Sequence, residues 1–464
     1  MRMTRSWAAW LWWVLPATAW PEAFPEAQPQ EESGRPPSDA LAEPPSERPV
    51  QAVSRASGWH YLTRLEATTL TLQPRAGVGT SEGFVQVEPT LILDGGAEFG
   101  VNLGAPVRLR LWGGGEGLGL VRREDWDSLS DFGQVVRGLK LGSDNAPVGV
   151  WFGALESYSL LSAHLVRRYS NRSNPDYHPA GGFLTGTLGP LYTQAFASDV
   201  LGARLMGAEV ALDVQHVLFG QPRDPGRYTL ALSAVHDWGK SGGHAPPVTL
   251  AHLDSTAVVV VRPGFEAHLL AGWGGRPGEG GAWGAVVGAG ADALTPTLDM
   301  RLRLEVRRQH GGFRQGSFGP DYELARFKAA GPEDVPVAEA SFPDGYSAYG
   351  EAEVGWDAVR YGGLSRHLKL SLGAEAFSWG RFDVDGRVAV QLFARSLEVA
   401  LKWLGMGMGQ PGPRYLGAAE ARWRLLGGTL YVMGTGGTRL FPSPEGTLRP
   451  GAFASVGLGV DHAR

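Results

Sequence analysis

Residues 297–307 read Thr-Leu-Asp-Met-Arg-Leu-Arg-Leu-Glu-Val-Arg, with an apolar residue at every even position from Leu298 to Val306 and a charged one at every odd position from Asp299 to Arg307. An α-helix would scatter these charges around its circumference, whereas a β-strand sends them all to one face. The stretch is therefore predicted to be a strand with one apolar and one charged side.

The same alternation recurs through the last third of the chain, in residues 346–357, 368–375, 397–403 and 415–425. Long amphipathic strands, with almost no helical stretch to cover them, leave apolar faces that need a partner, and lipid is the most economical one. We therefore expect the odd-numbered residues of the 298–306 strand to line a lumen, and the even-numbered ones to meet lipid.

The N-terminal region shows two further segments. Residues 1–19 are predicted to be a signal peptide, because Arg2 and Arg5 precede an apolar core and a small-residue site at Ala17–Ala19. Residues 20–57 carry prolines among Glu, Gln and Ser, and are predicted to be a disordered Pro-rich periplasmic leader. Residues 58–464 are predicted to form an outer-membrane β-barrel. No other segment approaches the ~20 continuous apolar residues of a transmembrane helix.

Composition excludes several classes of function. The formal net charge is −5, which does not favour nucleic acid as a partner. There is no cysteine, which rules out disulfides and thiolate metal sites. The eleven histidines are scattered, and no phosphate-binding loop or His-Glu-x-x-His motif occurs, so no cofactor and no metal site are predicted.

Connection lengths predict the architecture. Short turns alternate with long connections such as residues 309–344, as in up-and-down outer-membrane barrels, where periplasmic turns are short and external loops are longer. The predicted fold is an all-β, transmembrane antiparallel up-and-down β-barrel of about 18 strands, with a range of 16 to 20. A soluble β-propeller is the main rival, but no fixed-period repeat of the kind that blades require occurs.

The signal peptide, the absence of cysteine, the acidic charge and the Gly-rich alternating strands resemble bacterial outer-membrane β-barrel proteins. At this size the chain is similar to porins and to barrels associated with capsule or exopolysaccharide systems. The resemblance implies an outer-membrane location, contact with outer-membrane lipid and with the barrel-insertion machinery, and possible periplasmic or envelope protein partners. One departure is the end of the chain, because such barrels usually finish on an aromatic residue and the nearest one here is Phe453.

Residues 121–213 are too charged to face lipid, and we expect them to fold inward and narrow the lumen. Residues 157–168 show no alternation, which is compatible with a short helix. A solvated external loop is the alternative for the whole region. The candidate residues of this lumen constriction are Arg122, Arg123, Asp125, Asp127, His164, Arg167, Arg168, Arg172, Asp176 and Arg204.

Three functions follow as hypotheses. The first is a channel that passes hydrophilic solutes or polysaccharide, and the second is a non-conducting outer-membrane anchor of an envelope machine for export or surface motility. The third, an outer-membrane lipid hydrolase, rests on His164, Ser170, Asn171 and Ser173 and requires a geometry that spacing does not establish. The sequence therefore favours a protein that is not an enzyme.

Overall fold

The computed structural model describes residues 60–463, except 75–80, 96–97, 114–118, 143–146, 174–176, 203, 221–227, 240–246, 279–280, 296, 330–341, 358–366, 394–395 and 443–447. The predicted signal peptide and leader lie outside the described residues. No helix in the described part of the chain is long and apolar enough to cross a membrane.

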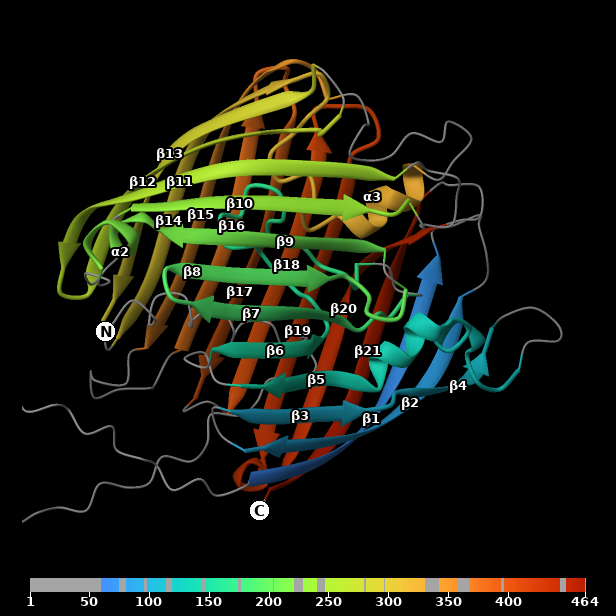
Figure 1. The fold of residues 1–464 in the computed structure, drawn as a ribbon. Helices are drawn as coiled ribbons and strands as arrows, with labels where there is room; N and C mark the ends of the chain where they lie inside the picture. The colour runs from blue at the N-terminus through green and yellow to red at the C-terminus, as the bar shows by residue number, and fades with distance from the viewer. Residues whose placement is uncertain are drawn as a thin grey trace, which may run out of the picture.

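The described chain forms a single sheet of twenty-one antiparallel strands (Figure 1). The first ten are β1 (His60–Pro74), β2 (Glu82–Asp94), β3 (Phe99–Gly104), β4 (Val107–Trp112), β5 (Val136–Leu141), β6 (Val148–Gly153), β7 (Gly181–Leu188), β8 (Leu191–Ala197), β9 (Leu205–Asp213) and β10 (Tyr228–Asp237). The others are β11 (Val248–Arg262), β12 (Phe265–Gly275), β13 (Trp283–Leu294), β14 (Leu298–His310), β15 (Gly345–Asp357), β16 (His367–Phe377), β17 (Phe382–Leu392), β18 (Leu397–Met408), β19 (Arg414–Leu425), β20 (Leu430–Pro442) and β21 (Leu448–Ala463).

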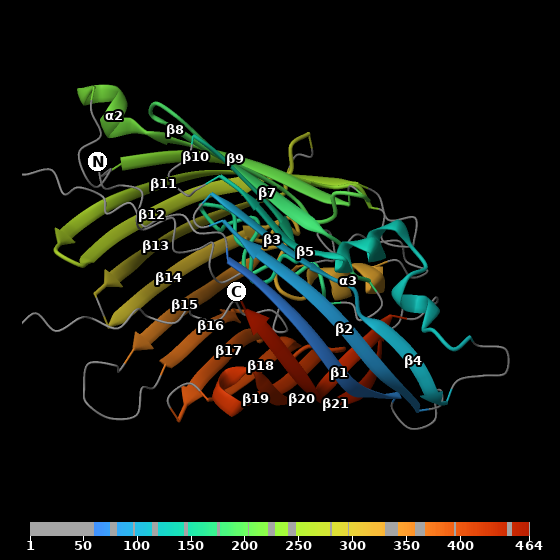
Figure 2. The same ribbon diagram turned by 90° about the horizontal axis from the view of Figure 1, so that it is seen from below.

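The sheet closes on itself, because β1 pairs with β2 on one side and with β21 on the other (Figure 2). Strands β3 and β4 act as one interrupted strand, since they pair with successive halves of β2. Pro106 lies in the interruption, and proline has no N–H for the sheet ladder. The described strands thus build a closed barrel of twenty positions, which confirms the predicted fold class and lies at the upper limit of the predicted range.

The wall is uneven in height. Strands β5 to β8 have six to eight residues, whereas β11 to β21 have 11 to 16. Two α-helices lie among the described connections, α2 (Val214–Phe219) after β9 and α3 (Tyr322–Ala329) between β14 and β15. Three short 3-10 helices are η2 (Arg123–Asp125), η3 (Leu129–Gln134) and η5 (Leu426–Gly428).

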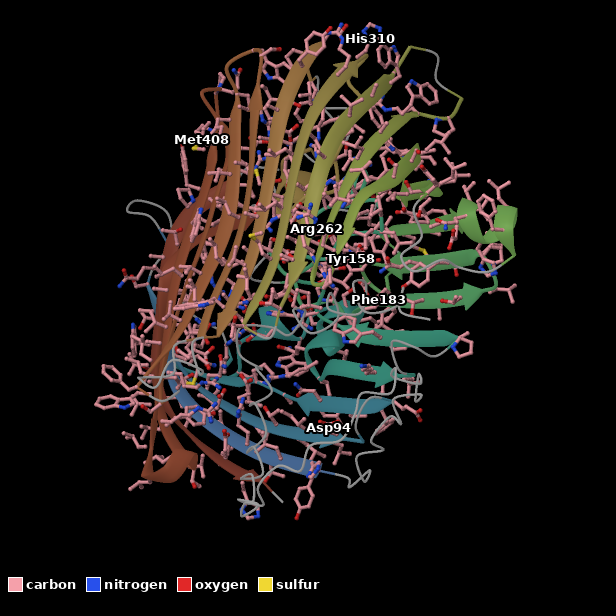
Figure 3. All side chains as sticks on the ribbon, turned by 90° about the vertical axis from the view of Figure 1, so that its left-hand side faces the viewer. Asp94, Tyr158, Phe183, Arg262, His310 and Met408 are labelled. Atoms are coloured by element: carbon pink, nitrogen blue, oxygen red, sulfur yellow. The ribbon has the colours of Figure 1, made fainter. Side chains whose placement is uncertain are left out.

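Antiparallel order places connections alternately at two ends of the barrel. Asp94, at the end of β2, lies at one end, and His310 and Met408, at the ends of β14 and β18, lie at the other (Figure 3). We call these the terminal end, where β21 finishes, and the loop end. The connections after β4, β6 and β14 all belong to the loop end, whereas several connections at the terminal end are tight, such as the two residues between β11 and β12.

Strand β14 has the two faces that were predicted for residues 298–306. On β14, Leu302, Leu304 and Val306 are exposed, whereas Glu305 and Arg307 are buried. Exposed apolar side chains continue around the described wall, and include Leu232 on β10, Leu253 on β11, Leu269 and Trp273 on β12, Val287 on β13, Leu401 on β18, Trp423 on β19 and Val456 and Leu458 on β21. A closed sheet with an apolar outside and a charged inside is the pattern of a transmembrane barrel.

Candidate functional site: the charged lumen

The connection between β6 and β7 runs inside the ring of strands in its described part, residues 154–173 and 177–180, which we call the inner segment (Figures 1 and 2). It contains no helix in its described part, so the sequence-based suggestion of a short helix over residues 157–168 is wrong. Tyr158 and Tyr169 instead exchange backbone hydrogen bonds of 2.9 and 2.8 Å. The result is a wide irregular hairpin, in which Ala163 and Arg168 have positive φ angles of 58° and 51°.

A second connection from the loop end packs against the inner segment. Residues 311–321, here called the partner loop, run parallel to it, with Phe318 N donating to Leu165 O at 3.2 Å and Arg167 N donating to Phe318 O at 3.1 Å. Backbone groups of both connections are thereby paired inside the barrel, which removes the cost of burying them unpaired.

An apolar cluster holds the two connections to the wall. Val166, Tyr169 and Phe318 are fully buried, and Tyr158 stacks on Phe183 of β7 with ring centroids 5.5 Å apart (Figure 3). The cluster also takes in inward-facing residues of β6 and of β8 to β11, namely Trp151, Phe196, Leu205, Val235, Val248 and Leu250. The loop end of the lumen therefore contains a packed hydrophobic core.

A network of buried ion pairs lies beside this core. Arg167 donates to Glu305 of β14 at 3.0 Å and to Glu351 of β15 at 2.5 Å. Arg168 donates to Asp385 of β17 at 2.6 Å and to the hydroxyl of Ser371 at 2.6 Å. Two adjacent arginines thus join the inner segment, which connects β6 and β7, to β14, β15 and β17 on the opposite side of the barrel.

Glu305 is the centre of this network. It accepts from Arg167, from Arg303 and, at 2.7 Å, from Arg307, all from inside the barrel. Arg307 also donates to Glu375 at 3.1 Å. A buried carboxylate that faces three guanidinium groups is compensated in charge, as a group removed from water must be.

The electrostatics of the inner segment follow from these contacts. Burial alone would lower the pKa of Arg167, but Glu305, Tyr349 and Glu351 more than offset it and raise the pKa well above its ordinary value. Arg172 differs, because it bonds only to the backbone carbonyls of Gly133 and Pro179 within the described residues. Burial lowers the pKa of Arg172 to about 10. Arg167, which faces carboxylates of the wall, therefore retains its positive charge to higher pH than Arg172, which does not.

A small open pocket lies between the inner segment, the partner loop and the wall. Its charged lining consists of four arginines and three carboxylates, which are Arg167, Arg168, Arg307, Arg314, Glu375, Asp383 and Asp385. Arg314 comes from the partner loop and bonds to Glu375 at 3.1 Å and to Asp383 at 2.8 Å. Opposed rows of charge of this kind produce a transverse field across an aqueous path.

The structure distributes the ten predicted residues over several places. Arg167 and Arg168 meet the wall as described, and His164 bonds to Asp254 of β11. Arg122 and Asp125 pair at 2.6 Å near η2, where Asp125 also accepts from Arg108 at 2.5 Å.

Among the described residues, Arg123, Arg172 and Arg204 do not contact Glu305, Glu351 or Asp385. Arg123 and Asp127 are exposed in or beside η2, and Arg172 bonds to the backbone carbonyls named above. Arg204 stacks over Tyr177 at 4.1 Å, and Asp176 lies outside the described residues. A role of these residues in a constriction therefore stays a prediction.

Sequence reasoning placed Glu305 in the lumen by alternation and named Glu351 as a carboxylate opposite the arginines, and Arg167 contacts both, but it did not assign the other wall residues of the site. Glu375 and Asp385 occupy inward positions of alternating strands, so the alternation could have suggested them as partners for the arginines. His252 and Asp254 on β11, which contact His164, were not found because the strand around them carries a weaker alternation.

The proposed hydrolase geometry is not present among the described residues. Asn171 uses its side chain for the backbone of Leu155 and Ser198. His164 bonds to Asp254 and Arg303, and no contact joins it to Ser170. All three groups lie inside the barrel, where a bilayer lipid does not reach them.

These features define the class of the protein as a closed antiparallel barrel of outer-membrane type, with a charged lumen that its own loop-end connections partly fill. No protein-family model matches the sequence, and a comparison with curated proteins gives no match.

Among solved structures, the chain is similar to OccAB3 from Acinetobacter baumannii, at 9% identity and a TM-score of 0.39, with 88% of this chain and 100% of that one covered. It is also similar to Wzi from Escherichia coli, described as a carbohydrate-binding β-barrel involved in group 1 capsule assembly, at 12% identity and a TM-score of 0.35, with 86% and 84% covered. For CdiB from Acinetobacter baumannii, at 7% identity and a TM-score of 0.29, 86% of this chain matches 60% of that one. Such low values say nothing about the activity of this chain.

Proposed function

We propose that the protein is an outer-membrane channel for small hydrophilic solutes, whose lumen is restricted by the inner segment and the partner loop. The observation that carries the proposal is the bridge of Arg167 and Arg168 to Glu305, Glu351 and Asp385 across the inside of the barrel. It sets opposed charges in a confined space, where they act on a passing solute with less screening than at an open surface.

The exposed apolar side chains of the wall support a location in the membrane, since charge is costly on the lipid side of such a barrel. The same charged lining supports selection of solutes by charge and dipole, whereas a polysaccharide chain would need a wider path and hence displacement of the inner segment.

A non-conducting anchor is the second candidate, and one observation favours it. Val166, Tyr169 and Phe318 are fully buried inside the lumen, so the inner segment is packed as a core is packed and not merely laid across an opening. If this core closes the lumen, the protein acts through surfaces that its loop end and its terminal end present to envelope partners.

Planar-bilayer conductance of the purified barrel separates the two. The informative variant is the double substitution Arg168→Gln with Asp385→Asn, because it removes both charges of the bridge at 2.6 Å and leaves Glu351 paired with Arg167 and Glu353 paired with Arg301. We expect wild type to conduct, and the double variant to conduct more at each opening with an altered preference between anions and cations.

The matched control is Arg110→Gln with Glu82→Gln, an ion pair of 2.9 Å between β4 and β2 that does not involve the inner segment. Its conductance should equal that of wild type. A wild-type barrel that is folded but never conducts would overturn the channel proposal and favour the anchor, and equal conductance in wild type and both variants would remove the inner segment from the path.

A further inference from the structure

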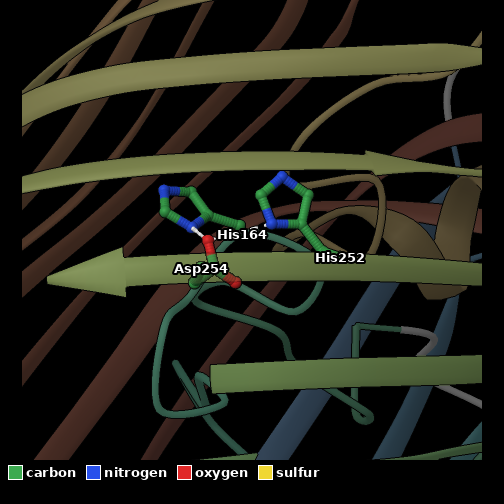
Figure 4. Close-up of side chains that lie close together, drawn as sticks. All are labelled: His164, His252 and Asp254. Atoms are coloured by element: carbon green, nitrogen blue, oxygen red, sulfur yellow. Dashed lines mark hydrogen bonds and ion pairs between the residues drawn. The ribbon is translucent and has the colours of Figure 1, made fainter. Parts of the chain in front are cut away.

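A compact group of metal-ligating side chains lies where the inner segment meets β11. His164 comes from the inner segment, and His252 and Asp254 come from the strand (Figure 4). Their ligand atoms all lie within 4.8 Å of one another, and all three residues are buried. The His164 Nδ1 and His252 Nδ1 atoms approach the same oxygen, Asp254 Oδ1, at 2.5 and 2.9 Å.

The carboxylate of this cluster has no guanidinium or ammonium partner. Among the described residues, Asp254 has no arginine or lysine within ion-pair distance, and its only charged partners are the two histidines. Glu209 of β9 is a second buried carboxyl group that interacts with Asp254, and its hydrogen bonds come from the backbone and hydroxyl of Ser162. Buried carboxylates in this situation need a proton or a cation nearby.

Buried polar atoms without a hydrogen-bond partner also indicate a missing ligand in this cluster. His252 is 1% exposed, and neither of its ring nitrogens has a hydrogen-bond partner in the described part of the chain, although Nδ1 lies 2.9 Å from Asp254 Oδ1. The second oxygen of Asp254, Oδ2, is also buried without a partner. Buried polar atoms are rarely left unsatisfied, so three in one cluster, with His252 Nδ1 directed at the shared carboxylate, call for a ligand that is not a protein group.

We propose that His164, His252 and Asp254 bind a first-row divalent transition metal ion, with Zn²⁺ as the representative, and that the ion joins the inner segment to the barrel wall. Two imidazoles and one carboxylate are a ligand set that such ions accept, and three protein ligands leave a position for water. The ion takes the place of the hydrogen bond between His164 Nδ1 and Asp254, and it also satisfies His252 Nδ1, which has no hydrogen-bond partner in the described chain.

The geometry requires only a small adjustment. Metal bonds of ~2.0–2.2 Å to nitrogen and oxygen set neighbouring ligand atoms about 3.3 Å apart in a tetrahedron. The present separations of 2.5 and 2.9 Å must therefore open by less than about 1 Å, which is within reach of the side-chain torsions of the two histidines.

The outer contacts of His164 suit a ligand. With a metal on Nδ1, the proton of the imidazole moves to Nε2, which lies 3.5 Å from Glu305 Oε1. A carboxylate behind a ligating histidine orients the ring and increases its basicity. Arg303, whose Nη2 atom is 2.7 Å from the same Nε2, must turn away, and its bond to Glu305 gives it an alternative partner.

The test uses the full-length barrel, folded in detergent, without a polyhistidine tag and treated with a chelator. Zn²⁺ binding is measured by equilibrium dialysis and elemental analysis, and Co²⁺ serves as a second probe through its visible absorption bands. We expect one ion per barrel for wild type. We expect at least tenfold weaker binding for His252→Asn and for Asp254→Asn.

His236→Ala is the matched control, because His236 is a half-buried barrel histidine whose Nδ1 atom contacts only Thr249, at 2.8 Å, and it should bind like wild type. Heat-modifiable gel mobility shows whether each variant is folded. If Asp254→Asn does not fold, His252→Asn alone provides the comparison with wild type. A wild-type barrel that takes up no more Zn²⁺ than these variants overturns the proposal and leaves a buried imidazolium–carboxylate pair. Metal content does not depend on conductance, so this result stands apart from the channel proposal.

Discussion

Replacing Glu305 by Gln isolates the interaction on which the inner segment depends most. The side chain is 3% exposed and accepts from Arg167, Arg303 and Arg307. The substitution keeps the shape of the group but removes the negative charge that faces three guanidinium groups, so it tests charge compensation and not packing.

The expected loss of stability depends on which carboxylates each arginine still contacts after the substitution. Breaking a buried ion pair by removing one partner typically costs ~3–5 kcal/mol. Arg167 keeps Glu351 at 2.5 Å and Arg307 keeps Glu375 at 3.1 Å, whereas no other carboxylate lies within ion-pair distance of Arg303 in the described chain. One uncompensated charge instead of three places the loss near the lower limit, about 3 kcal/mol in the free energy of unfolding.

The assay is reversible folding in urea, read as the fraction of heat-modifiable band. Glu398→Gln is the control, because Glu398 lies on β18, is half-buried and has no ion pair among the described residues. It should change the free energy of unfolding by less than about 0.5 kcal/mol. If Glu305→Gln and Glu398→Gln have the same urea midpoint, the network does not hold the inner segment and the argument fails.

Two further outcomes follow. Leu304→Arg should cost ~2–4 kcal/mol and reduce assembly into liposomes, because Leu304 is 67% exposed on the apolar side of β14, while Leu304→Ile should assemble normally; equal yields would mean that this side does not face lipid. Burial lowers the pKa of His178 in the folded protein, so the unfolded chain binds a proton on this residue more readily than the folded chain does. The contribution of neutral His178 to the free energy of unfolding therefore falls as the pH drops through and below the unfolded pKa of about 6.5. The protection factors of the inner-segment amides, which are corrected for the intrinsic pH dependence of exchange, should accordingly fall between pH 7.5 and 5 in wild type and change less in His178→Gln. An identical pH response of the protection factors in both proteins would contradict this assignment.

Local sequence was sufficient to predict the strands of the barrel wall but not the conformation of the inner segment. Alternation depends only on neighbours along the chain, which is why the two faces of β14 could be predicted from its own residues. The conformation of the inner segment depends on partners far away in sequence, such as Asp385, which is 217 positions from Arg168. No local pattern encodes such a pairing, and the hairpin between Tyr158 and Tyr169 is likewise specified by the apolar cluster around it.

The uneven wall has a consequence for the surrounding bilayer. Six residues of β5 span ~20 Å along the strand, and a tilt of ~40° reduces their height to about 15 Å. The apolar band of an outer-membrane barrel is ~25 Å tall, a height that the fifteen residues of β11 exceed at the same tilt. Lipid beside β5 and β6 must therefore be thinner than lipid beside β11. The barrel therefore deforms the bilayer on one side only. A neighbouring protein with a similarly short wall would lower the free-energy cost of that deformation if it bound next to β5 and β6.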